Sequence, residues 1–122
     1  MSPSQENPEP IGPLTPAMFH VLLALAGEDL HGYAILKEVE MRTGGKVRLS
    51  TGTLYGIIKR LLVDGLIVER RSRPSEAMDD ERRRYYHLTP QGRQAATAEA
   101  ERMDEILAVA RSRNLLKKPR TA

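Results

Sequence analysis

One segment, residues 49–68, constrains the fold more than any other part of the chain. Its apolar residues recur at intervals of three and four, which gathers them into one stripe along an α-helix. Ser50 or Thr51 can cap the amino end and Gly65 suits a left-handed closing residue, so a helix is predicted over about residues 51–64. The stripe consists of Leu54, Ile57, Ile58, Leu61 and Leu62, and the other side carries Thr53, Tyr55, Lys59 and Arg60. Such a helix can dock on a core and still present polar groups to a partner.

Basic residues are concentrated on this helix and just after it. The 122-residue chain has a formal net charge of only +3, so its total charge is a weak indication of an anionic partner. The distribution says more, because residues 46–73 contain only Asp64 and Glu69 as acids. The basic residues of the same stretch are Lys46, Arg48, Lys59, Arg60, Arg70, Arg71 and Arg73. This pattern indicates a polyanion as the partner.

Before this helix, the sequence predicts an arm, two helices and a short strand. Residues 1–13, with four prolines, are expected to be disordered. A first helix should begin at Thr15 and Pro16, where a capping oxygen precedes a proline suited to the first helical position. A second helix is expected from Asp29 to Gly45, followed by a short strand at residues 46–49. The inward residues of the second helix would be Tyr33, Ile35, Leu36 and Val39.

A hairpin and a last helix are predicted after Gly65. Two stretches rich in β-forming residues flank a polar turn at residues 74–81, and their alternation directs Tyr86 and Leu88 towards the core. The pair Thr-Pro at residues 89–90 then opens a helix that runs to about residue 114, before a basic tail. The narrow apolar stripe of this helix is typical of a helix that packs on another helix. It consists of Met103, Ile106, Leu107 and Ala110.

This order of elements predicts a mainly α fold with a small β-hairpin, namely a winged helix-turn-helix with an added carboxy-terminal dimerisation helix. A helix has the right width for the major groove of DNA, and a hairpin with arginines can follow the adjacent backbone or enter the minor groove. We therefore expect an arm at 1–13, a DNA-binding domain at 14–89, a dimerisation helix at 90–114 and a flexible basic tail at 115–122. The expected contacts with double-stranded DNA are Lys46, Ser50, Thr51, Thr53, Tyr55, Lys59, Arg60, Arg70, Arg71, Arg73 and Arg84.

Several motifs along this frame resemble the PadR family of transcriptional regulators, of the compact type with one carboxy-terminal helix. They are His31-Gly32-Tyr33, Ser50-x-Gly52-Thr53-Leu54-Tyr55, Lys59-Arg60-Leu61, Asp64-Gly65-Leu66-Ile67 and Arg84-x-Tyr86-x-Leu88-Thr89-x-x-Gly92. The resemblance covers roughly residues 14–92. It implies a homodimer, assembled through the last helix, that binds a roughly palindromic operator and usually represses transcription. Some compact members bind flat hydrophobic compounds through an aromatic residue of that helix, which this chain lacks, so a small-molecule effector stays unspecified.

Other kinds of chemistry have little support in the sequence. There is no cysteine, and the three histidines lie on separate predicted elements without metal-ligand spacing. Ser50 has no identifiable base that would make it a nucleophile. The longest apolar run, residues 21–26, is far shorter than the roughly 20 residues that cross a bilayer. We expect no catalytic residue, no metal, no cofactor, no membrane partner and a cytoplasmic location.

Some of the candidate residues also have structural interpretations. Tyr55 could pack its ring on the hairpin, and the basic residues of the helix could be solvated charges. Gly52 and Gly56 could permit close approach to phosphate or reflect crowding against a neighbouring helix, and His31 is expected to be a hydrogen-bonding residue at a helix start. The main alternative function is a winged-helix protein-interaction module without DNA binding. Such a module would be expected to lack the basic residues that this chain retains.

Overall fold

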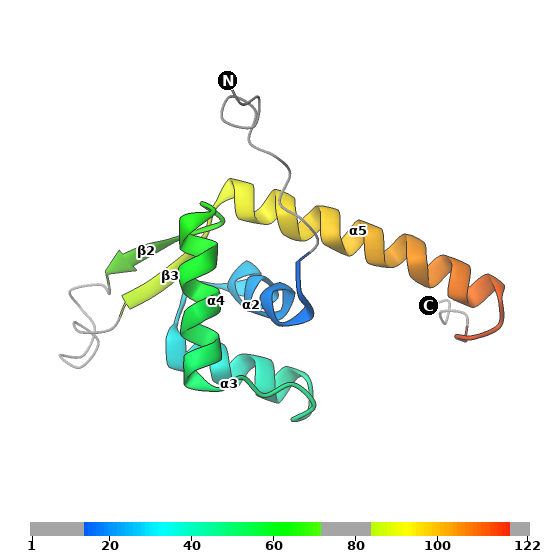
Figure 1. Cartoon of the computed structure of the whole chain (residues 1–122), viewed down its shortest axis with the longest axis horizontal. Helices are drawn as coiled ribbons and strands as arrows, with labels where there is room; N and C mark the ends of the chain where they lie inside the picture. The colour runs from blue at the N-terminus through cyan, green and yellow to red at the C-terminus, as the bar shows by residue number, and fades with distance from the viewer. Residues whose placement is uncertain (1–13, 72–83, 118–122) are drawn as a thin grey trace, which may run out of the picture.

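The structure is a computed structural model that describes residues 14–71 and 84–117, and it is a winged helix with a projecting last helix (Figure 1). Helices α2 (Pro16–Gly27), α3 (Gly32–Arg42) and α4 (Thr51–Val63) surround one core. Strands β1 (Leu30–His31), β2 (Ile67–Arg71) and β3 (Arg84–Leu88) form an antiparallel sheet with β3 in the centre. Helix α5 (Pro90–Ser112) passes over α2 and extends beyond it. The predicted fold class is therefore confirmed.

Some predicted features fall outside the described residues. They are the arm at 1–13, the polar turn at 74–81 together with Arg73, and the basic tail from residue 118 onward. Within the described part of the chain, no helix combines the length and the apolar character that a membrane span requires.

Side-chain atoms cap the helices where the sequence predicts that they do. Thr15, Ser50 and Thr89 each occupy an N-cap position and accept a hydrogen bond from the amide three residues on, at 2.9–3.1 Å. His31 caps α3 in the same way through Nδ1 at 3.2 Å, which confirms its predicted structural role. Gly65 has a φ of +76° just after α4, so the predicted left-handed closing residue is also confirmed.

The core is mainly aliphatic, and α4 contributes the predicted stripe to it. Leu54, Ile58 and Leu61 are buried, and the other two stripe residues are half-buried at the margin. Tyr86 and Leu88 face the same core from β3, as the alternation predicts. Each fully buried side chain of this size stabilises the fold by about 1.5–3 kcal/mol. Burial of the stripe therefore fixes which face of α4 remains outside.

The third strand is not where the sequence places it. Residues 46–49 are predicted to form a strand, but they are irregular, and the strand that pairs with β3 is β1. The hydroxyl of Thr43 explains the difference, because it donates to the Val39 carbonyl at 2.8 Å and accepts from the Val47 amide at 3.0 Å. These hydrogen bonds hold residues 46–49 against the end of α3. The strand position beside β3 is occupied instead by Leu30 and His31, which precede α3.

Helix α3 is shorter than the predicted 29–45. Strand β1 takes its first residues, and Gly44 and Gly45 end it with φ values of +62° and +82°. Tyr33 is 62% exposed, so the prediction that it faces inward is wrong. It lies one position away from the buried stripe, on the outer face, where the Nζ atom of Lys37 lies 5.7 Å from its ring centroid.

Backbone contacts at the end of α4 position the start of α5. The Thr89 hydroxyl donates to the Gly65 carbonyl at 2.7 Å, and the Thr89 amide donates to the Leu66 carbonyl at 3.1 Å. Gly92 lies so close to Leu66 that a Cβ atom at Gly92 would overlap with the Leu66 carbonyl oxygen. Only glycine fits this contact, so the direction in which α5 leaves the domain depends on it.

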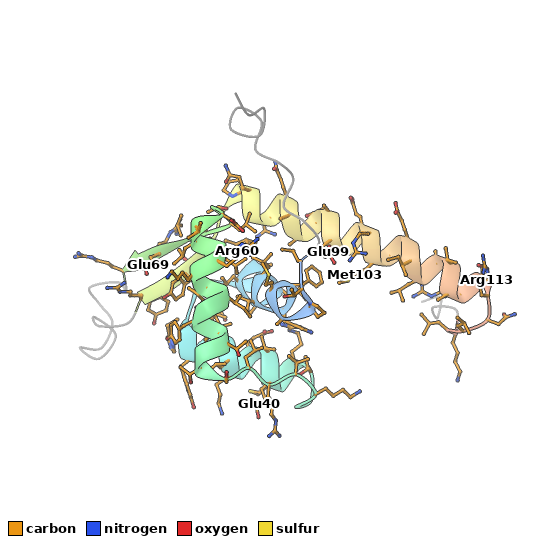
Figure 2. All side chains as sticks on the ribbon, in the orientation of Figure 1. Glu40, Arg60, Glu69, Glu99, Met103 and Arg113 are labelled. Atoms are coloured by element: carbon orange, nitrogen blue, oxygen red, sulfur yellow. The ribbon has the colours of Figure 1, made fainter. Side chains whose placement is uncertain are left out.

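Further along α5, Glu99 is buried beside α2 (Figure 2). Its carboxylate pairs with the Arg102 guanidinium, whose Nε lies 3.3 Å from Oε1, and this hydrogen bonding lowers the pKa of Glu99. A backbone hydrogen bond of Leu14 lowers the pKa further. A lowered carboxyl pKa contributes stability above the ordinary carboxyl range, and that contribution is lost as the pH falls through the lowered pKa. The pair therefore secures the amino-terminal end of the described chain to α5 at neutral pH.

We expect Gly92→Ala to lower the free energy of unfolding by about 1–3 kcal/mol, because the new methyl group must displace the backbone of Leu66. Denaturant titration followed by circular dichroism measures the change. Gly56→Ala is the matched control, since a Cβ there meets nothing within 4 Å and should stabilise α4 by about 0.5–1 kcal/mol. Equal effects of the two substitutions would contradict the close contact.

Candidate nucleic-acid interface

The amino end of α4 holds a pair of hydroxyl groups at the surface. Ser50 Oγ accepts from the Thr53 amide at 3.0 Å and donates to Thr53 Oγ1 at 2.9 Å. Because the Thr53 oxygen receives this proton, its own proton remains available for an acceptor outside the chain. The first turn of the helix adds unpaired backbone amides and the positive end of the helix dipole. This end of α4, where Thr51 is also exposed, therefore favours an anion or a hydrogen-bond acceptor.

Beyond the first turn, one outward row of α4 carries little side-chain bulk. A Cβ atom at Gly52 or Gly56 would meet nothing within 4 Å, so crowding against a neighbouring helix does not explain these glycines. Lys59 continues the row, and Val63 ends it with 76% of its surface exposed. Sequence reasoning missed Val63, although its spacing from the two glycines and Lys59 places it on the same row. A partner can approach the backbone of α4 closely along this row.

Tyr55 connects α4 with the start of α3. The residue is 47% exposed, and its ring lies on Gly32, where a Cβ atom would be 2.9 Å from the ring Cζ and would overlap with the hydroxyl oxygen. The hydroxyl therefore lies at the amino end of α3, next to the cap formed by His31. The phenol group of Tyr55 thus joins the outward side of α4 to the start of α3.

The hairpin carries exposed arginines on both of its strands. Arg84 Nη1 lies 3.3 Å from Glu69 Oε2 on the neighbouring strand, and Figure 2 shows Glu69 on the hairpin beside α4. Arg71 stands opposite Arg84 in the strand register and has no ion pair within residues 14–71 and 84–117. The last described residues of the two hairpin strands, Arg71 and Arg84, are thus both basic.

Asp29 joins the loop before β1 to the hairpin. One carboxylate oxygen lies 2.7 Å from His87 Nδ1 and the other lies 3.4 Å from Arg70 Nη1. Burial raises the pKa of the neighbouring Tyr86, and the charge of Glu69 raises it further, so that hydroxyl stays neutral. These groups are structural, and the described residues include no cluster of three or more His, Cys, Asp or Glu that could hold a metal ion.

Ion pairs divide the predicted DNA-contacting cations into two groups. Among them, Arg60 Nε lies 2.8 Å from Asp64, and Arg70 and Arg84 have the ion pairs described above. Arg48, which is not one of the predicted contacts, is also paired, with its Nε 3.7 Å from Glu40. All four arginine side chains are more than half exposed, so each pair contributes only about 0–1 kcal/mol and can exchange its acid for a phosphate at little cost. The cations without an acidic partner in the described part of the chain are Lys46, Lys59 and Arg71.

The residues of α5 that are predicted to form a dimer interface differ in the exposure of their side chains. Met103 packs against the core on the α2 side of the helix (Figure 2), and Ala110 is half-buried. Ile106 is 54% exposed and Leu107 is 41% exposed. Sequence reasoning missed Val109, which is 52% exposed and lies three residues after Ile106. The apolar surface that remains available is therefore on the distal half of α5.

Comparison with known proteins identifies relatives among transcriptional regulators. The model of the transcriptional regulator PadR-like family matches residues 21–98. The transcriptional regulator Rv3488 of Mycobacterium tuberculosis is 36% identical over 87 residues, which make up 71% of this chain and 75% of that protein.

Solved structures of similar proteins have the same fold. A transcriptional regulator from Clostridium thermocellum has 25% identity and a TM-score of 0.66, covering 78% of this chain and 86% of that one. A PadR family transcription regulator from Clostridium difficile has 26% identity and a TM-score of 0.66, covering 78% and 94%. With its motifs, its winged helix and the family match over most of its length, this chain belongs to the PadR-like family of transcriptional regulators.

Proposed function

We propose that the protein is a homodimeric repressor that binds a roughly palindromic DNA operator, with residues 14–89 as the DNA-binding domain and residues 90–114 as the dimerisation helix. Membership of the PadR-like family supports regulation through DNA. The observation that carries the proposal is the outward face of α4, where the Thr53 hydroxyl proton, the open row at Gly52 and Gly56, and Lys59, which has no acidic partner among the described residues, lie together. The proposed DNA contacts are Lys46, Ser50, Thr51, Thr53, Tyr55, Lys59, Arg60, Arg70, Arg71, Arg73 and Arg84.

In this proposal α4 enters the major groove with its amino end towards the bases. Gly52 and Gly56 let the backbone of α4 approach the DNA closely, because at these two positions no side chain separates the backbone from the duplex. Thr53 acts as a hydrogen-bond donor, since its oxygen already accepts from Ser50. A donor at this position suits the acceptors on purine edges, such as N7, or the O4 atom of thymine. Lys59 and Arg60 follow further along the helix, where they would contact the flanking phosphates.

The hairpin and Tyr55 position the protein on the backbone of the duplex. Arg70 and Arg84 exchange their weak, exposed acid contacts for phosphates, and Arg71 needs no exchange because it has no acid partner in the described residues. Tyr55 donates its hydroxyl to a phosphate at the start of α3, where unpaired helix amides also point outward. These contacts supply affinity and orientation, and they carry little sequence information.

Two copies related by a two-fold axis would present two α4 helices to successive major grooves. In proteins of this kind the half-sites are about 34 Å apart, one turn of DNA. The exposed apolar side chains of distal α5, Ile106 and Leu107, support the dimer, because a second copy of the same helix would cover them.

The first expected outcome concerns salt. If each subunit places about four basic residues near phosphates, the dimer neutralises about eight charges, and a plot of log K against log salt should have a slope of about −7. Fluorescence anisotropy with operator and random duplexes at several salt concentrations measures it. A slope shallower than about −3 would favour the alternative, a winged-helix interaction module that does not use DNA.

The second outcome separates base reading from positioning. Thr53→Ala should change the relative affinities among operator variants, since it removes a donor near the base edges. Arg71→Ala should weaken all duplexes by a similar factor and make the salt slope shallower by about one unit per subunit. Selection of bound sequences from a random duplex pool provides the measurement. An unchanged consensus for Thr53→Ala together with an altered one for Arg71→Ala would reverse the two roles.

The third outcome concerns assembly. Replacing Ile106 and Leu107 together with lysine should give monomers that bind operator DNA much more weakly, because the charged side chains cannot be buried against a second helix. Sedimentation velocity at micromolar concentration measures the state of assembly, and circular dichroism checks that the domain is still folded. A monomeric unmodified chain would exclude the proposed homodimer.

A further inference from the structure

The outward face of α3 carries two exposed side chains that lie close together, Tyr33 and Lys37. They are one helical turn apart, so both project from the same side of the helix. Tyr33 is 62% exposed, and its hydroxyl has no hydrogen bond within residues 14–71 and 84–117. The Nζ atom of Lys37 lies 5.7 Å from the centroid of the Tyr33 ring. A phenol hydroxyl and an ammonium group, both of them hydrogen-bond donors, therefore stand side by side at the surface.

Lys37 carries a charge that the described part of the chain does not balance. The two acids of α3 are already paired with arginines. Glu38 pairs with Arg42 at 2.8 Å, and Glu40 lies 3.7 Å from Arg48. Lys37 itself forms no ion pair among the described residues. Its contact with the Tyr33 ring restricts a flexible side chain, so less conformational entropy is lost when the ammonium group binds an anion.

The start of α3 lies between α4 and the hairpin (Figure 1). On one side, the Tyr55 ring of α4 covers Gly32, the first residue of α3. On the other side, His31 stands opposite Tyr85 in the antiparallel pairing of β1 with β3. The chain continues from His31 into α3 in the direction in which β3 leads back to Arg84. A duplex that contacts both α4 and the hairpin therefore passes over the start of α3.

We infer that Tyr33 and Lys37 form a third DNA contact, which binds the phosphate backbone between the groove that receives α4 and the backbone segment that the hairpin holds. The inference rests on the proposed function and adds two residues to it. Lys37 neutralises a phosphate, and the Tyr33 hydroxyl donates a hydrogen bond to the same stretch of backbone. The Tyr33 ring positions Lys37 for this contact. Neither residue reads a base, so both act on affinity and orientation.

The contact is confined to the first two turns of α3. Met41, one turn beyond Lys37, is 77% exposed, and its side chain has neither a charge nor a hydrogen-bond donor. It lies about 12 Å beyond Tyr33 along the helix axis, away from the end of α3 that meets the hairpin. The outward row of α3 thus consists of a donor pair beside the proposed interface and an apolar residue at the far end.

The salt dependence of binding distinguishes the two side chains. The probe is a duplex that the unmodified protein selects from a random pool, and fluorescence anisotropy measures its binding. Lys37→Gln should weaken binding about tenfold and make the slope of log K against log salt shallower by about one unit per subunit, because a charge contact is lost. Tyr33→Phe should weaken binding about threefold with an unchanged slope, because it removes a neutral donor and keeps the ring. Lys37→Arg keeps the charge and should keep the slope.

A double substitution tests whether the ring positions the lysine. In a chain with Tyr33→Leu, which lacks the ring, Lys37→Gln should weaken binding only about threefold instead of tenfold. Both side chains are exposed, so the melting temperature measured by circular dichroism should not change in any of these variants. A tenfold effect of Lys37→Gln with or without the ring would overturn the positioning role of Tyr33.

Lys117→Gln is the matched control. It makes the same substitution just after the end of α5, whose distal part extends away from α4 and the hairpin (Figure 1). Both the affinity and the salt slope should stay at the values of the unmodified protein. If Lys37→Gln behaved like Lys117→Gln, the third contact would be overturned while DNA binding, and with it the proposed function, remained. An unmodified chain that selects no duplex and binds random DNA with a slope shallower than about −3 would overturn the proposed function itself.

Discussion

The contact between the start of α5 and the end of α4 determines how the last helix is held on the winged-helix domain. Thr89 bonds to the backbone of Gly65 and Leu66, and Gly92 brings α5 against the Leu66 carbonyl. The junction therefore fixes the angle between the helix with the outward polar face and the helix with the free apolar end. In the homodimer that we propose, this angle would set the separation of the two α4 helices, so a backbone contact away from the proposed DNA contacts would determine which half-site spacing fits.

Much of this fold can be predicted from the sequence because its signals are local. The caps Thr15, Ser50 and Thr89 act on amides three residues away, and the stripe of α4 lies within one helix. Strand β1 escapes prediction, since a two-residue strand has no periodicity of its own and exists only through its pairing with β3. The prediction for Tyr33 is wrong for a related reason. The apolar character of a tyrosine ring does not by itself show whether the ring faces the core with Ile35 and Val39 or faces outward.

In the candidate site, too, features that depend on local sequence are predicted, and features that depend on contacts between distant residues are not. The exposed polar face of α4 follows from helical period, and its residues lie where the sequence predicts. Which arginines form ion pairs does not follow, because the acids that pair with two of them lie on other elements. Asp29, which pairs with Arg70, is 41 residues away in the sequence, and Glu40, which pairs with Arg48, lies within α3. Only the folded chain distinguishes cations that already have an acidic neighbour from Lys46, Lys59 and Arg71, which have none among the described residues.

The open glycine row of α4 has a consequence for the mechanics of this helix. A glycine inside a helix weakens it by about 1 kcal/mol relative to alanine, and a Cβ atom at Gly52 or Gly56 would meet nothing within 4 Å, so no close contact requires a glycine at either position. Helix α4 therefore has a low intrinsic helix stability. Its order depends on the packing of its buried side, which consists of Leu54, Ile58 and Leu61. A substitution that loosens the packing of the buried side would therefore also disorder the outward face of α4, which we propose contacts DNA.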